Sequence, residues 1–194
     1  MWHDVLRDPR LYALLSRYDE DWAEQVRGGG CPACGGRLHR ADYPRKSRGA
    51  AATLERGYEV RRSFCCAAPE CRRRRTPESV RFLGRRVYLG AVVLLGSALA
   101  LGLSARRVAA LREQLGVDRR TLMRWRQWWQ ESFVASGFWR IARGAFVPAV
   151  VTDALPAALL ERFTAADPCV RVLQILTWLA PLSIAGSRAA AAAG

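Results

Sequence analysis

The chain has 194 residues, enough for one domain, or two small ones, with a hydrophobic core. Its 31 basic side chains outnumber its 17 acidic ones and leave a net charge of +14, which favours a polyanionic partner, either nucleic acid or an acidic membrane surface. There are only two histidines, and we find neither a nucleophile–base pair nor a phosphate-binding glycine loop, so the sequence argues against an enzyme.

The first unit, residues 1–30, is predicted to be an amphipathic helix used for packing or for binding a partner. Pro9 after Asp8 marks the helix start, and three consecutive glycines after Arg27 mark its end. The apolar face carries Leu11, Leu14, Leu15 and Tyr18. The segment has charges throughout and no apolar core of a secretory signal, so we expect a cytoplasmic, nucleoid-associated protein.

Two groups of cysteines predict a structural zinc ribbon over residues 31–84. The first is the knuckle CPACGG, and the second holds Cys65, Cys66 and Cys71, with short strands expected around residues 38–43 and 57–64. Strand alternation places Phe64 and Cys66 on one side, which favours Cys66 over Cys65, although Cys65 stays open. The expected zinc ligands are Cys31, Cys34, Cys66 and Cys71. The alternatives are His39 as a substitute ligand, or reduced cysteines packed as small hydrophobic residues.

A basic arm leaves the ribbon. Residues 61–86 contain nine arginines, four of them consecutive, and a solvated charge run is the ordinary interpretation of such a segment. Because it lies between a predicted zinc site and a predicted DNA-binding unit, we expect phosphate contacts instead. The residues expected to make them are Arg72, Arg73, Arg74 and Arg75.

Residues 87–105 form an uncharged stretch of nineteen residues, close to the length of a membrane span. Its glycines and serines dilute its hydrophobicity, and it directly precedes the next motif. We therefore expect a buried core helix, and membrane insertion is the alternative.

Residues 103–130 have the pattern of a helix-turn-helix within a trihelical unit at residues 85–132. Ser104 is the expected first cap, Gly116 the end of the first helix and Asp118 the cap of the second. The first helix should pack through Val108, Leu111 and Leu115.

The second helix sorts its residues by face. Leu122, Trp125 and Trp129 form an apolar stripe for packing. The opposite, basic face is expected to enter the groove of a duplex, although an ordinary solvated face is the simpler alternative. The residues expected to contact nucleic acid are Arg119, Arg120, Thr121, Arg124 and Gln127.

The C-terminal segment, residues 133–186, is predicted to contain helices at residues 155–163 and 168–184, with Cys169 packed inside. The second of these helices is amphipathic and offers a surface for packing or for a homodimer. The tail, residues 187–194, has low complexity and is expected to be disordered.

The chain is therefore expected to be mainly α with a small β zinc ribbon. The order of CPACGG knuckle, basic linker, second cysteine cluster and helix-turn-helix resembles the small zinc-ribbon and helix-turn-helix proteins of bacterial insertion sequences, over about residues 31–132. The resemblance implies sequence-specific binding of double-stranded DNA, as a transposition accessory protein working with a transposase or as a transcriptional regulator. Too few carboxylates follow Gln130 for a transposase catalytic domain. The alternatives are a membrane-anchored zinc-ribbon protein and an RNA-binding one.

Overall fold

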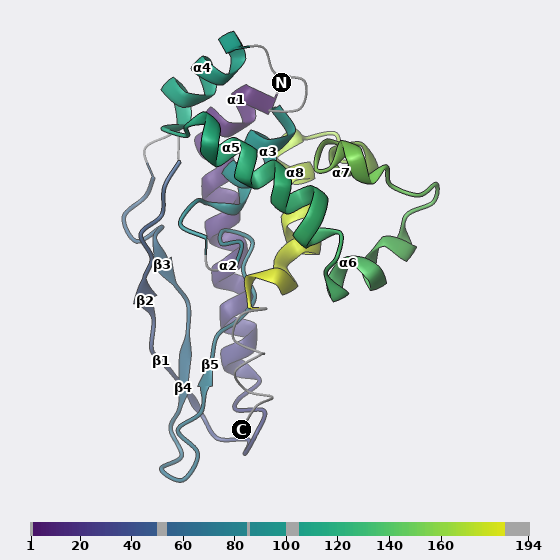
Figure 1. The fold of residues 1–194 in the computed structure, drawn as a ribbon. Coiled ribbons are helices and arrows are strands. Elements are labelled where there is room, and N and C mark those ends of the chain that lie inside the picture. The colour runs from purple at the N-terminus through teal and green to yellow at the C-terminus, as the bar shows by residue number, and fades with distance from the viewer. Residues whose placement is uncertain (1, 50–53, 85, 100–104, 185–194) are drawn as a thin grey trace.

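The computed structural model describes residues 2–49, 54–84, 86–99 and 105–184, with the side chains of 105–108 left aside. It is mainly helical with a small antiparallel sheet, as predicted (Figure 1). The predicted cap at Ser104, the side chain of Val108 and the tail at residues 187–194 lie outside the described part.

Two helices open the chain, α1 (Trp2–Arg7) and α2 (Pro9–Gly28). Asp8 caps α2, because its carboxylate accepts a hydrogen bond of 2.9 Å from the backbone N–H of Arg10. Leu11, Tyr12 and Leu15 bury the apolar face of α2 in the main core. The predicted packing helix is confirmed, whereas the short α1 before it was not predicted.

The sheet is made of very short strands. β1 (Leu38–Arg40), β4 (Phe64–Cys66) and β5 (Arg74–Arg75) lie in the order β1-β4-β5, and β2 (Tyr43–Pro44) pairs with β3 (Val60–Arg61). These three strand pairings are antiparallel. Strands were expected around residues 38–43 and 57–64, and β1 to β4 lie in or next to these ranges. The segment predicted as a basic arm, however, contributes an edge strand, β5.

The uncharged stretch forms α3 (Gly90–Leu99), which is buried from its first residue through Ser97. It contacts α1, α5, α7 and α8, so it is the central helix of the molecule. Its glycines are sites of close packing: a Cβ on Gly96 would lie 3.1 Å from the ring of Trp125, and one on Gly90 3.2 Å from Leu176. The predicted core helix is thus observed. None of the described helices has the length and hydropathy that crossing a bilayer requires.

The two helices of the predicted helix-turn-helix are α4 (Ala105–Leu115) and α5 (Arg119–Gln127), and α5 continues into a π-helical turn, η1 (Trp128–Phe133). α5 packs against α3, the helix that the prediction placed first in a trihelical unit. The difference is that α3 is shared: one hydrophobic cluster contains residues from the segments 1–30, 85–132 and 133–186.

The C-terminal segment folds back over this core. Its elements are α6 (Gly137–Ala142), η2 (Arg143–Ala145), η3 (Thr152–Ala154), α7 (Ala157–Arg162), α8 (Pro168–Leu179) and η4 (Ala180–Ser183). α8 packs on α1, α2 and α3, and it buries Val172, Ile175 and Leu176. This apolar face was the one expected to serve packing or a homodimer, and within the chain it serves packing. Cys169 is also buried, and burial raises the pKa of its thiol to about 11.

Candidate metal centre and nucleic-acid interface

The first cysteine knuckle follows directly after α2. The backbone N–H of Cys31 donates to the carbonyl of Gly36 at 2.9 Å, and the N–H of Gly35 donates to the carbonyl of Cys31 at 2.8 Å. Gly35 has a φ of +71°, which favours glycine. A Cβ on Gly36 would lie 3.0 Å from the sulfur of Cys66 and 3.3 Å from that of Cys34. The two glycines of CPACGG therefore make the turn and leave room for sulfur atoms.

The second knuckle begins in β4. The N–H of Cys66 donates to the carbonyl of Arg73 at 2.9 Å, and the N–H of Cys71 donates to the carbonyl of Ala68 at 3.0 Å. Arg72 has a φ of +45°, a left-handed conformation that is uncommon outside glycine. This tight turn brings Cys71 back to Cys66 despite the four residues between them.

The four predicted ligands come together. The sulfur atoms of Cys31, Cys34, Cys66 and Cys71 all lie within 4.8 Å of one another, with 3.7 Å between Cys31 and Cys71 and 3.4 Å between Cys34 and Cys66. A tetrahedral ion with metal–sulfur bonds of about 2.3 Å separates its sulfurs by about 3.8 Å, whereas a disulfide needs about 2.05 Å. The cluster therefore has the dimensions of a tetrahedral metal site.

Backbone N–H groups around the knuckle favour the thiolate form of Cys31. The N–H of Ala33, and after it that of Cys34, lower the pKa of the Cys31 thiol to about 7. The other three thiols differ: the neighbouring cysteines contribute to a raised pKa for Cys34, Cys66 and Cys71, as expected where several thiols share one site.

Cys65 lies on the other side of β4. Along this strand Phe64 and Cys66 are buried and Cys65 is half-buried, and the Cys65 thiol points to the carbonyl of Arg72 at 3.4 Å. The preference for Cys66 over Cys65 is confirmed by this geometry. His39 is exposed on β1 and is not among the four residues of the cluster.

Two arginines of the basic segment are internal. Arg61 and Arg81 are each 2 % exposed. Arg81 donates from Nε to the Asp19 carboxylate at 2.7 Å and from its terminal nitrogens to the carbonyls of Tyr58 and Val60. Arg61 donates to backbone carbonyls. The prediction that this whole segment is a phosphate-binding surface is therefore wrong for these two, which hold the fold together.

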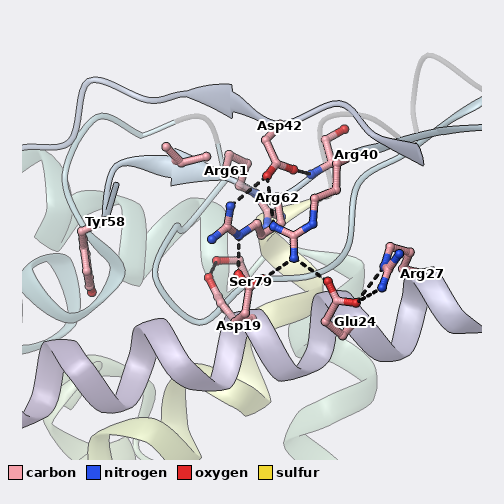
Figure 2. Close-up of polar contacts among 12 residues, drawn as sticks. Asp19, Glu24, Arg27, Arg40, Asp42, Tyr58, Arg61, Arg62 and Ser79 are labelled. Carbon is pink, nitrogen blue, oxygen red and sulfur yellow. Dashed lines mark hydrogen bonds and ion pairs between the residues drawn. The ribbon is translucent and has the colours of Figure 1, made fainter. Parts of the chain in front are cut away.

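A second group of ion pairs surrounds this contact on the outside. Arg40 pairs with Glu20 and Glu24 of α2, and Arg62 pairs with Glu20 and with Asp42, so the strands are tied to α2 (Figure 2).

The turn between α4 and α5 has the predicted caps. Gly116 has a φ of +62°, and the Asp118 carboxylate accepts a 2.6 Å hydrogen bond from the N–H of Thr121, which lowers the pKa of Asp118. Both expected apolar stripes are buried where their side chains are described: Leu111, Leu115, Leu122, Trp125 and Trp129.

The opposite face of α5 is open. Arg119, Arg120, Arg124 and Gln127 are exposed, and no ion pair to these arginines occurs among the described residues. Thr121, which we expected to touch nucleic acid, is only 3 % exposed, and its hydroxyl accepts a 3.0 Å hydrogen bond from Arg124. Its role is to orient Arg124. Met123, which was not among the predicted contact residues, is 53 % exposed on this face.

The four ribbon arginines, Arg72 to Arg75, are exposed as well. Arg74 differs from the others, because it donates to the hydroxyl of Ser63 at 2.8 Å and to the carbonyl of Ala41 at 2.6 Å, and it lies over the ring of Tyr43. The Arg74 side chain is thus fixed on the ribbon by these three contacts.

No protein-family model matches the chain, and comparisons with curated proteins and with solved structures likewise found no match. The resemblance to insertion-sequence proteins stays a prediction, and the function has to be argued from the chemistry of these surfaces.

Proposed function

We propose that this chain is a non-catalytic protein that binds double-stranded DNA, with the exposed face of α5 in the major groove and a structural metal in the ribbon. The observation that carries the proposal is the face itself. Three unpaired arginines and a glutamine lie on one side of a capped helix whose other side is fixed in the core. A rigid helix that presents such side chains meets the geometric requirement for reading base edges.

The composition of α5 favours this interpretation over a merely solvated helix. A solvated basic face commonly carries acidic residues one turn away, which stabilise the helix. The sequence of α5, RRTLMRWRQ, has no acidic residue, and Asp118 at its N-cap is the carboxylate that interacts with Arg124, so the arginines of the helix outnumber the acidic groups beside them and repel one another. A polyanion would relieve that repulsion.

Individual side chains on the face suit the task. Arg124, oriented by Thr121, presents a planar fork of donors that matches the two acceptors of guanine. Gln127 now donates to Glu131 at 3.0 Å, and the same amide can pair with adenine when that contact opens. Arg119 and Arg120 lie at the helix start, where they would reach phosphates or bases.

The metal would be zinc. Four thiolates at tetrahedral spacing suit zinc or iron–sulfur chemistry, and a site filled by four protein ligands leaves no position for water or substrate. Its role would be to hold the ribbon together, since the strands there have only two or three residues each.

The biological setting follows from the predicted resemblance: a transposition accessory protein that acts with a transposase, or a transcriptional regulator. The membrane-anchored alternative draws no support from α3, whose surface is covered by four neighbouring helices.

Selection of bound DNA from a random pool of duplexes tests the proposal. The purified, zinc-loaded chain is mixed with a random pool of duplexes and bound DNA is sequenced, with structured RNA as competitor. We expect enrichment of one motif that contains guanine, and poor competition by RNA. Absence of an enriched motif, or equal competition by RNA, would overturn the proposal.

A further inference from the structure

We propose that the ribbon turn formed by Arg72, Arg73 and Arg75 is a second contact surface for the phosphates of the same duplex, held about one helical turn away from α5. This inference rests on the proposed function, and it adds a fixed spacing between two contacts on the DNA.

Three arginines of the ribbon turn carry charges that no other group of the described chain neutralises. Arg72, Arg73 and Arg75 are exposed, and among the described residues none of them forms an ion pair or donates a side-chain hydrogen bond. Arg74, between them, is used to hold the sheet. Since β5 lies at the sheet edge, these side chains are not covered by another strand.

The metal site is the alternative partner for the charges of these arginines. Four thiolates around a divalent ion carry a net charge of −2, which nearby arginines can neutralise. In that case guanidinium groups would donate to the sulfurs, but within the described ranges no arginine side chain is hydrogen-bonded to any of the four sulfur atoms. The charges of the turn face outward, where they can meet phosphates.

The distance between the ribbon turn and α5 is related to the length of α2. The start of α2 lies in the main core through Leu11 and Tyr12, and its end packs against the cysteine cluster through Ala23 and Val26. Twenty residues of helix rising 1.5 Å each span about 30 Å. In Figure 1, α5 lies toward the end of the molecule where α2 begins, and the labels of β4 and β5 lie toward the end where α2 finishes. One turn of duplex spans about 34 Å, similar to the length of α2, and we infer that the two surfaces meet one duplex about ten base pairs apart.

The ribbon is held on α2 by buried and exposed ion pairs. The buried contact between Asp19 and Arg81 fixes α2 to the chain segment that leaves the ribbon, and Arg40 fixes β1 to α2 from outside (Figure 2). When α5 is bound, the ribbon turn is therefore presented at one position along the duplex, so the second contact costs little additional ordering.

The experiment compares two double variants that each remove two exposed arginines. The test variant is Arg73→Ala with Arg75→Ala, which leaves the unusual backbone of Arg72 unchanged. The matched control is Arg140→Ala with Arg143→Ala, in the α6 region. Both are checked for metal content and helicity, and then used in hydroxyl-radical footprinting and in titrations on a 30-base-pair duplex at several salt concentrations.

We expect the wild type and the control to protect two patches about ten base pairs apart. The test variant should keep the α5 patch, lose the other, and show a salt dependence of log K lower by about 2, because each phosphate contact contributes about 0.9. A single patch in the wild type, or a test variant that behaves like the control, would overturn the inference while the proposed function stands. Failure of the proposed function looks different: no duplex binding by the wild type, or full binding after Arg120→Ala with Arg124→Ala.

Discussion

The carboxylate of Asp19 accepts a 2.7 Å hydrogen bond from Nε of Arg81, and both side chains are only 2 % exposed. The same carboxylate accepts hydrogen bonds from the hydroxyl of Ser79 and the backbone N–H of Val80. One carboxylate in the middle of α2 thus accepts hydrogen bonds from three consecutive residues about sixty positions later in the chain. This contact joins the ribbon to the helical core, and the relative placement of the two surfaces depends on it.

Replacing Asp19 by asparagine should destabilise the protein strongly. The change leaves the Arg81 charge buried without a counter-charge, and breaking a buried pair on one side costs about 3–5 kcal/mol. Urea unfolding at neutral pH measures the loss in the free energy of unfolding. Glu24→Gln removes an exposed partner of Arg40 and is the control. Its free energy of unfolding should fall by only a small fraction of the loss seen for Asp19→Asn. Equal losses for the two variants would contradict the structural role of Asp19.

The adjacent cysteines give a matched pair for the metal site. Cys66→Ser should reduce bound zinc to well below one ion per chain and weaken the ribbon, because it removes one of four clustered sulfurs. Cys65→Ser should keep a full ion, since that thiol points to the carbonyl of Arg72. Elemental analysis of both purified variants decides the matter. Loss of metal from Cys65→Ser alone would show that the ligand assignment is wrong.

The cap of α5 should make stability depend on pH. The N–H of Thr121 lowers the pKa of Asp118 in the folded state, so the stabilisation is present above the ordinary aspartate pKa of about 3.9 and is lost as the pH falls through the lowered pKa. Asp118→Ala should lower the melting temperature at pH 7, and its difference from wild type should shrink in acid. Asp118→Asn retains a capping oxygen and should stay close to wild type at pH 7. An alanine variant as stable as wild type at pH 7 would refute the cap.

Met123 gives a prediction about bases. It is 53 % exposed on the proposed reading face, where an apolar side chain suits the methyl group of thymine. Deoxyuridine in place of each thymine of the selected site, one position at a time, should weaken wild-type binding at one position by several-fold. The same change in the DNA should leave the affinity of the Met123→Ala variant unchanged. A thymine effect that persists in the variant would exclude Met123 as its cause.

Local sequence signals identified the features that depend on neighbouring residues. Asp8 and Pro9 marked the start of α2, Gly116 and Asp118 marked the turn before α5, and the alternation of β4 distinguished Cys66 from Cys65. Each of these is decided within a few residues by caps, backbone freedom or strand periodicity, and such patterns can be read without a fold.

What could not be predicted depends on partners that are distant in the chain. Arg61 and Arg81 looked like part of a charged surface because Asp19 and the carbonyls that satisfy them lie 16 to 62 residues away. β5 was missed since two arginines carry no strand signal of their own, and pairing with β4 creates it. Thr121 is a different case, because it lies one helical turn before the buried Trp125 and is itself 3 % exposed, so its place on the packed side could have been read from local periodicity.

The central claim is that α5 reads bases, and Arg124 tests it most directly. Affinity is measured by fluorescence anisotropy for the selected duplex and for a scrambled duplex of equal length, at one salt concentration. Arg124→Ala should reduce the ratio of the two affinities about tenfold or more, because a bidentate contact to one base contributes about 1–3 kcal/mol of discrimination. Arg140→Ala, the control, should leave the ratio unchanged. Equal losses on both duplexes for Arg124→Ala would contradict the account.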